Sequence, residues 1–218
     1  MVGNMVEAVA SDVGANGLLA RVSAYYHDIG KLAKPGYFFE NKGENFNKHE
    51  KLAPTMSRLI LESHVRDGIT LARENKLPRL VRDAIAQHHG TSLMTFFYHR
   101  AKQRDPQVSE TEYRYPGPRP RSRELGVVLL ADQIDAAARS LDEPTPSRLR
   151  GVIKQLIEKR VLDGELDDSH LTLKDLAAIR DAFIPILMGL FHGRISYPKV
   201  EQSRGKTSAG ATAESAGR

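Results

Sequence analysis

The sequence contains no cysteine, which excludes disulfide bonds, thiolate-bound zinc and cysteine-ligated iron–sulfur clusters. It also lacks an apolar run of the roughly 20 residues needed to cross a bilayer, and its N-terminus shows no secretory signal. From these absences we expect a soluble, cytoplasmic chain that makes no membrane contact itself. An apolar fraction of 40% over 218 residues is sufficient for one domain with a hydrophobic core.

The positive charge is concentrated in one stretch. The net charge is +5, and the segment from Tyr98 to Arg123 holds seven Lys and Arg residues against three Asp and Glu. Such an excess is compatible with an anionic ligand such as a nucleotide. A solvated loop would have the same composition, so this segment alone does not decide between the two.

Helical periodicity recurs in every long apolar segment, and no convincing strand pattern is present. Asn16 is a candidate N-cap, Gly68 is expected to interrupt a helix, and Thr172 with Asp175 forms a candidate capping box. The predicted helices cover residues 1–13, 17–27, 54 onward, 78–90, 91–102, 123–141, 147–162 and 172–191. The fold class is therefore all-α, with one domain over residues 1–198 and a disordered Ser/Gly/Ala-rich tail over 199–218.

Histidines and aspartates occupy the apolar faces of several predicted helices. His64, His88 and Asp132 each continue an apolar stripe, and His27 with Asp28 ends another. Burying a carboxylate without a partner is costly, and no Lys or Arg shares the face of Asp132. Each residue alone has an ordinary explanation as a hydrogen-bonded core histidine or a paired aspartate. Together they favour a metal site, because imidazole and carboxylate suit zinc, iron or manganese.

These residues lie within longer motifs, which follow one another in a characteristic order. The motifs are Tyr25-Tyr26-His27-Asp28-Ile29-Gly30-Lys31, His64-Val65-Arg66-Asp67-Gly68, Gln87-His88-His89-Gly90-Thr91-Ser92, Arg114-Tyr115-Pro116-Gly117-Pro118 and Leu130-Ala131-Asp132. The set resembles the HDIG form of the HD-domain metal-dependent phosphohydrolases. In particular it resembles the cytoplasmic domain of the seven-transmembrane HD phosphodiesterases that hydrolyse cyclic di-AMP. The resemblance covers about residues 1–198 and implies a helical bundle of the HD type.

The resemblance implies two divalent metal ions, iron or manganese, with Asp28 bridging them. The first would be held by His27, Asp28 and Asp132, and the second by Asp28, His64, His88 and His89. A hydroxide activated by both metals would then open cyclic di-AMP to linear di-adenylate. Besides Asp28, Lys31 would be catalytic and would neutralise a phosphate, although a solvated loop lysine is the alternative.

Other residues are candidates for contacts with the dinucleotide. His49 and Arg114 are expected to bind substrate, although His49 could equally contact a helix start. Four aromatic residues are candidates for stacking on adenine: Tyr37, Phe38, Phe39 and Tyr115. We expect a cyclic dinucleotide as the partner and no nucleic-acid polymer, and the sequence leaves a homodimer open.

One departure from the family pattern concerns the first metal. Family members carry a further histidine ligand on the first helix, and the match places it about three residues before Met1. We therefore expect an N-terminally truncated domain of a membrane-anchored parent, with a weak first metal site. Two alternatives stay open, namely an HD phosphohydrolase acting on another nucleotide and a degenerate HD domain that senses nucleotide or metal. The intact pairs His27-Asp28 and His88-His89 argue against the degenerate domain.

Overall fold

The computed structural model describes residues 1–38, 48–141 and 144–192, and within these ranges the chain is helical with no β-strand. The α-helices are α1 (Val2–Ala10), α2 (Gly17–Tyr26), α3 (Pro54–Glu74), α4 (Arg79–Gln87), α5 (Thr95–Arg104), α6 (Arg123–Arg139), α7 (Pro146–Leu162) and α8 (Leu173–His192). Short 3-10 turns are η1 (Ile29–Ala33), η2 (Pro35–Tyr37), η4 (Lys48–Glu50) and η5 (Glu110–Tyr113). The all-α prediction is confirmed. The described ranges do not include Phe39 or residues 193–218, which contain the predicted tail.

Two helix starts follow the predicted capping chemistry. The Asn16 side chain accepts a hydrogen bond from the Leu19 amide at 3.0 Å and begins α2. Before α8, the Thr172 amide donates to Asp175 at 2.8 Å, and the Asp175 amide donates to Thr172 Oγ1 at 3.2 Å. Each cap satisfies amide groups that have no partner within their own helix.

The helix predicted from Thr91 begins later, at Thr95. The preceding residues pair with the segment before Pro116, because Met94 N donates to Tyr113 O at 2.8 Å and Tyr115 N donates to Ser92 O at 3.1 Å. An antiparallel bridge between Leu93 and Arg114 lies between these bonds. The extended pairing satisfies backbone groups that a helical turn would otherwise use.

The predicted interruption at Gly68 is wrong, since α3 runs unbroken from Pro54 to Glu74. Gly68 instead allows a close approach between α3 and η1. A Cβ atom on Gly30 would lie 1.8 Å from the carbonyl oxygen of His64 and 2.5 Å from Gly68 N, and a Cβ on Gly68 would lie 3.1 Å from Gly30 N. Because neither glycine has a side chain, the segment after Asp28 can pack directly against the helix that carries His64.

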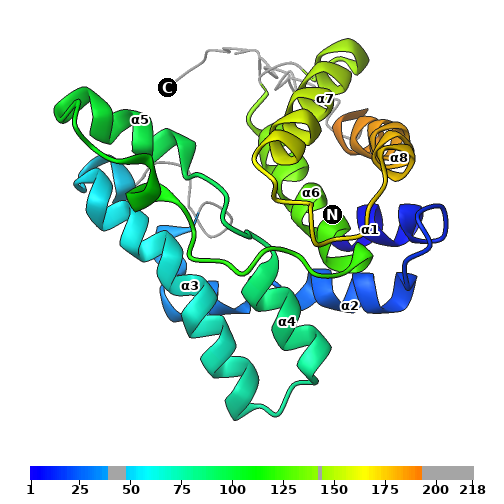
Figure 1. The fold of residues 1–218 in the computed structure, drawn as a ribbon, viewed down its shortest axis with the longest axis horizontal. Coiled ribbons are helices and arrows are strands. Elements are labelled where there is room, and N and C mark those ends of the chain that lie inside the picture. Colours follow the sequence, from blue (N-terminus) through cyan, green and yellow to red (C-terminus); the bar gives the residue numbers. More distant parts are fainter. Residues whose placement is uncertain (39–47, 142–143, 193–218) are drawn as a thin grey trace, which may run out of the picture.

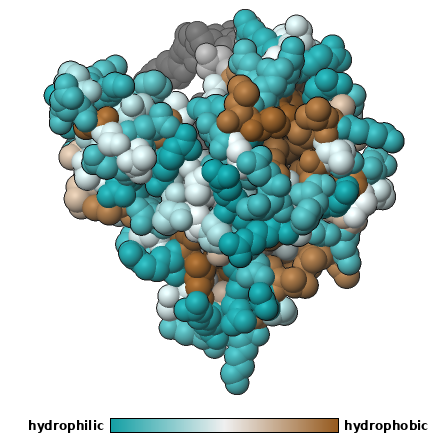
Figure 2. Space-filling view, in the orientation of Figure 1, coloured by the Kyte–Doolittle hydropathy of each residue, from teal (hydrophilic) through white to brown (hydrophobic). Residues whose placement is uncertain are grey.

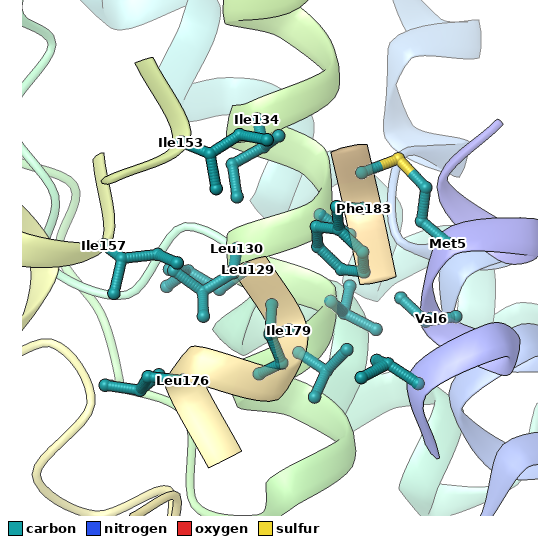
Figure 3. Close-up of a cluster of buried hydrophobic side chains, with 14 of the residues drawn as sticks. Met5, Val6, Leu129, Leu130, Ile134, Ile153, Ile157, Leu176, Ile179 and Phe183 are labelled. Carbon is teal, nitrogen blue, oxygen red and sulfur yellow. The ribbon is translucent and has the colours of Figure 1, made fainter. Parts of the chain in front are cut away.

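The hydrophobic core is organised around α6 (Figure 3). Leu129, Leu130 and Ile134 of α6 are fully buried, and Phe183 of α8 packs into the same cluster as Met5 of α1. Burying such side chains contributes roughly 1.5–3 kcal/mol each. This core fixes α6, and with it the position of Asp132 on that helix.

The molecule has two groups of helices (Figure 1). On one side α3 packs against α4 and α5, and on the other α1, α6, α7 and α8 surround the core, while α2 contacts α1, α4 and α6. Figure 2 shows apolar side chains gathered over α7 and α8, where Leu162 and Leu173 are exposed beside a groove between these helices. Within the described ranges, no helix combines the length and apolarity needed for a membrane span.

Candidate metal centre

The structure brings together the histidines and aspartates predicted from the sequence. One set, His27, Asp28 and Asp132, has ligand atoms within 4.8 Å of one another, and so does a second set, Asp28, His64, His88 and His89. These residues come from the end of α2, from α3, from the end of α4 and from α6. Convergence of four segments far apart in the sequence is what a metal centre requires, and a surface cluster would seldom achieve it.

Asp28 belongs to both sets and directs a different oxygen toward each. Its Oδ2 lies 3.0 Å from His27 Nε2, and its Oδ1 lies 3.4 Å from His64 Nε2 and 3.6 Å from His88 Nε2. Asp132 completes the first set, with Oδ1 at 3.5 Å from His27 Nε2. A carboxylate arranged in this way can bridge two cations, one through each oxygen.

Hydrogen bonds to the backbone orient three of the rings. The Nδ1 atom of each donates to a carbonyl three residues earlier: His27 to Ala24 at 2.6 Å, His88 to Ile85 at 2.9 Å, and His64 to Leu61. Donation from Nδ1 leaves the Nε2 lone pair directed into the cluster, and it is also the usual outer contact of a metal-bound histidine.

The donor set fits a metal better than it fits internal pairing. His64 Nε2 and His88 Nε2 lie 3.2 Å apart, and two ring nitrogens that both carry lone pairs cannot bond to each other. His27 Nε2 and Asp28 Oδ1 are buried and make no hydrogen bond of good geometry among the described residues. A cation between these atoms would satisfy all of them, and mixed imidazole and carboxylate donors suit a divalent transition metal.

The electrostatics of the cluster agree with this arrangement. Burial lowers the pKa of His64 to about 4 and also lowers the pKa of His89, so both rings are neutral donors at neutral pH. Burial opposes ionisation of Asp28, but the contact with His27 outweighs it and holds the pKa of Asp28 well below the usual value. For His27, burial is outweighed by Asp28 and Asp132, which raise its pKa. The two carboxylates therefore favour positive charge between them.

Comparison with known proteins places this geometry in a family. The sequence profile of the HD domain matches residues 1–137. The chain belongs to the HD-domain family. It is 45% identical over 199 residues to the cyclic-di-AMP phosphodiesterase PgpH of Bacillus subtilis, an alignment that covers 91% of the chain and 28% of that protein. The chain thus spans little more than a quarter of the length of this relative.

Solved structures agree with this assignment. The HD domain of Listeria monocytogenes phosphodiesterase PgpH, in complex with cyclic-di-AMP, has a TM-score of 0.85 and 42% identity to this HD domain, over 87% of this chain and 89% of that one. A second structure of the Listeria domain has a TM-score of 0.83 at the same identity, covering 88% and 90% of the two chains. The helical bundle of the HD type is therefore shown.

Lys31 lies at the edge of the cluster of this HD domain. Its Nζ is 2.6 Å from Asp28 Oδ2, and it lies 5.5 Å from the centre of the Phe38 ring. The side chain is only 20% exposed. The alternative of a freely solvated lysine does not agree with this position, whereas a phosphate next to Asp28 would lie within reach of the ammonium group.

The other two predicted substrate contacts are engaged by the protein itself. His49 is buried, bonds through Nε2 to Tyr37 O at 2.9 Å, and packs against Phe97. Arg114 bonds to Glu110 at 2.6 Å and to the carbonyl of Thr91 at 3.0 Å. Both arrangements stabilise loops next to the cluster, and a role in substrate binding stays a prediction for each.

A pocket of about 240 Å³ adjoins the candidate metal centre. His89 forms part of its wall, as do Tyr115, whose ring stacks on His89 with centroids 4.2 Å apart, and Gln133, which follows Asp132 on α6. Tyr115 was predicted from the sequence as a stacking residue, whereas Gln133 and the buried Arg160 beside it were not predicted. A signal for Arg160 was available, because it continues the buried stripe of α7 after Ile153 and Ile157.

Proposed function

We propose that this HD domain is a metal-dependent phosphodiesterase that hydrolyses cyclic di-AMP to linear di-adenylate. The observation that carries the proposal is the position of Asp28, which presents one carboxylate oxygen to each of two donor sets. Two-metal sites of this kind are typical of enzymes that cleave phosphate esters. The substrate is proposed from the relatives, which are named cyclic-di-AMP phosphodiesterases, and from the Listeria HD domain in complex with cyclic-di-AMP.

In this proposal two divalent ions, iron or manganese, would occupy the two donor sets. When bound, they supply Lewis-acid chemistry that generates a nucleophile from water at neutral pH and neutralises charge on the phosphate. The first ion would be held by His27, Asp28 and Asp132, and the second by Asp28, His64, His88 and His89. Water adds across one P–O bond of the cyclic dinucleotide, which opens the ring and leaves one free hydroxyl and one terminal phosphate.

The protein contributes orientation and charge. The carbonyls of α2, α3 and α4 that accept from Nδ1 of His27, His64 and His88 hold these rings in place before substrate arrives. Lys31 now pairs with Asp28 and would shift toward a phosphate oxygen, where its charge would stabilise the transition state. We also propose that the domain works in the cytoplasm as part of a longer, membrane-anchored protein.

The test is a chromatographic assay of the purified chain with cyclic di-AMP. The chain is first stripped of metal with a chelator and then supplied with Mn²⁺ or Fe²⁺. We expect linear di-adenylate with metal and none without it, formed slowly because only His27, Asp28 and Asp132 make up the first donor set. Binding of cyclic di-AMP without cleavage in either metal would favour the alternative of a sensor domain. Faster cleavage of another nucleotide would show that cyclic di-AMP is not the preferred substrate, while the proposed phosphate-ester hydrolysis would stand.

A further inference from the structure

The pocket beside the metal centre has the size of one half of a dinucleotide. Its volume is about 240 Å³, whereas pockets that enclose a whole drug-sized ligand measure roughly 300–1,000 Å³. His89 belongs both to its wall and to a metal donor set, and Gln133 is the residue after Asp132. A phosphate at the metals would therefore place one attached nucleoside at the mouth of this pocket.

Aromatic rings form part of the pocket wall. Tyr115 lies nearly parallel to His89, with an angle of 21° between the rings. Phe96 lines the same pocket and is 63% exposed, with its ring perpendicular to Phe97 at 5.1 Å. Aromatic faces of this kind stack on nucleobases, and each such contact contributes roughly 1–3 kcal/mol to binding.

The polar end of the pocket is a fixed amide. Gln133 Oε1 accepts a hydrogen bond from Arg160 Nε, and since arginine only donates, the amide oxygen must face it. Arg160 is itself buried and pairs with Asp163 at 3.2 Å, so it cannot easily turn away. Gln133 Nε2 is thereby held toward Ser92 Oγ, at 3.3 Å. This nitrogen carries two N–H groups, and Ser92 requires only one of them.

We propose that this pocket binds one adenine of the substrate and that Gln133 determines the preference for adenine. This inference rests on the proposed phosphodiesterase function. The Gln133 amide donates to N1 of adenine, and the Ser92 hydroxyl accepts from the exocyclic amino group. Guanine presents a ring N–H and a carbonyl on the corresponding edge, which would leave the Gln133 N–H facing another donor. Such unpaired groups discriminate strongly between ligands.

The decisive measurement is equilibrium binding, which does not depend on turnover. The Mn²⁺-loaded chain is titrated calorimetrically with AMP, GMP and ribose 5-phosphate, none of which contains a phosphodiester. We expect AMP to bind at least about 10-fold more tightly than ribose 5-phosphate, because only AMP carries a base for the pocket, and also more tightly than GMP. Equal affinity for AMP and ribose 5-phosphate would refute the proposal that the pocket binds adenine, but it would not contradict the proposed reaction.

Two variants test the residues separately. Gln133→Glu keeps the acceptor for Arg160 but loses the N–H, so the preference for AMP over GMP should fall about 10-fold or more. Phe96→Ala removes a ring that is 63% exposed, and the advantage of AMP over ribose 5-phosphate should fall by a similar factor. Gln155→Glu and Leu162→Ala, both exposed and outside the pocket, are the matched controls. An unchanged AMP-to-GMP ratio in Gln133→Glu would refute the assignment of Gln133.

Discussion

The Nε2 atoms of His64 and His88 face each other at 3.2 Å, while the Nδ1 atom of each ring donates to a carbonyl of its own helix. Two lone pairs at this distance repel, and burial keeps the rings from turning to water. A cation between these two nitrogens would replace the repulsion with two coordinate bonds. Metal should consequently stabilise the fold as well as serve the reaction.

We expect chelation to lower the thermal midpoint. A ligand present at about 100 times its Kd stabilises a protein by roughly 2.7 kcal/mol, and 1 kcal/mol corresponds to about 2–4 °C for a chain of this size, so the shift should be about 5–10 °C. Differential scanning fluorimetry with EDTA and then with excess Mn²⁺ measures it. In His88→Ala the shift should be only a small fraction of that in the unmodified chain. A full shift in this variant would contradict the assignment of His88 as a metal ligand.

Because Asp28 belongs to both donor sets, we expect Asp28→Asn to cause a large loss of turnover. The amide keeps the shape of the side chain but loses the charge and one of its two acceptor oxygens, so both donor sets lose a member. Turnover of cyclic di-AMP with Mn²⁺ should fall more than about 1,000-fold, because nucleophile activation and charge stabilisation are lost together. Asp181→Asn, on the exposed side of α8, is the control. Activity within a few-fold of the unmodified chain would rule out bridging by Asp28.

Substitution of Lys31 should lower turnover less than substitution of Asp28. Lys31→Ala removes one positive charge next to the proposed phosphate position but no candidate metal ligand, so kcat should fall about 10- to 1,000-fold while Mn²⁺ affinity changes little. Lys31→Arg should recover part of the lost rate, since it restores the charge with a different shape. Steady-state kinetics beside Mn²⁺ titrations separate the two effects, with the exposed Lys174→Ala as the control. A normal kcat for Lys31→Ala would return Lys31 to a structural role.

The elements that the sequence predicts best are those decided locally. Helical periodicity and the Asn16 cap depend on neighbours within a turn, so they needed no knowledge of the tertiary fold. The candidate metal donors could also be predicted from the sequence. Histidines and aspartates on apolar stripes would be costly to bury without a partner, so their positions require an explanation. Their order along the chain resembled one family, and this resemblance assigned each donor to a set.

What the sequence did not reveal depends on contacts between distant segments. The amide of Gln133 on α6 is fixed by Arg160 on α7, and no local pattern connects these residues. The late start of α5 results from pairing between Ser92 and Tyr115. Gly68 was misinterpreted for the same reason, since a glycine within a helix predicts a break unless another backbone, here that of Gly30, is known to approach it.

The contact between Gly30 and Gly68 gives a prediction about stability. A Cβ atom on Gly68 would lie 2.8 Å from Ile85 Cγ2 and 3.1 Å from Gly30 N. Gly68→Ala should therefore destabilise the fold by about 1–3 kcal/mol, the usual cost of forcing extra atoms into a packed interior. Because η1 follows Asp28 directly, the same change should also displace Asp28 from His64 and weaken Mn²⁺ binding.

The matched control is Gly151→Ala on α7, where an added Cβ would meet nothing within 4 Å. There the same substitution should stabilise the fold by about 0.4–1 kcal/mol, because alanine loses less backbone entropy than glycine in a helix. Urea unfolding of both variants without metal gives the two free energies, and Mn²⁺ titration of each gives the effect on the site. If Gly68→Ala were as stable as Gly151→Ala and bound Mn²⁺ equally well, the close approach of η1 to α3 would not be what holds Asp28 against His64.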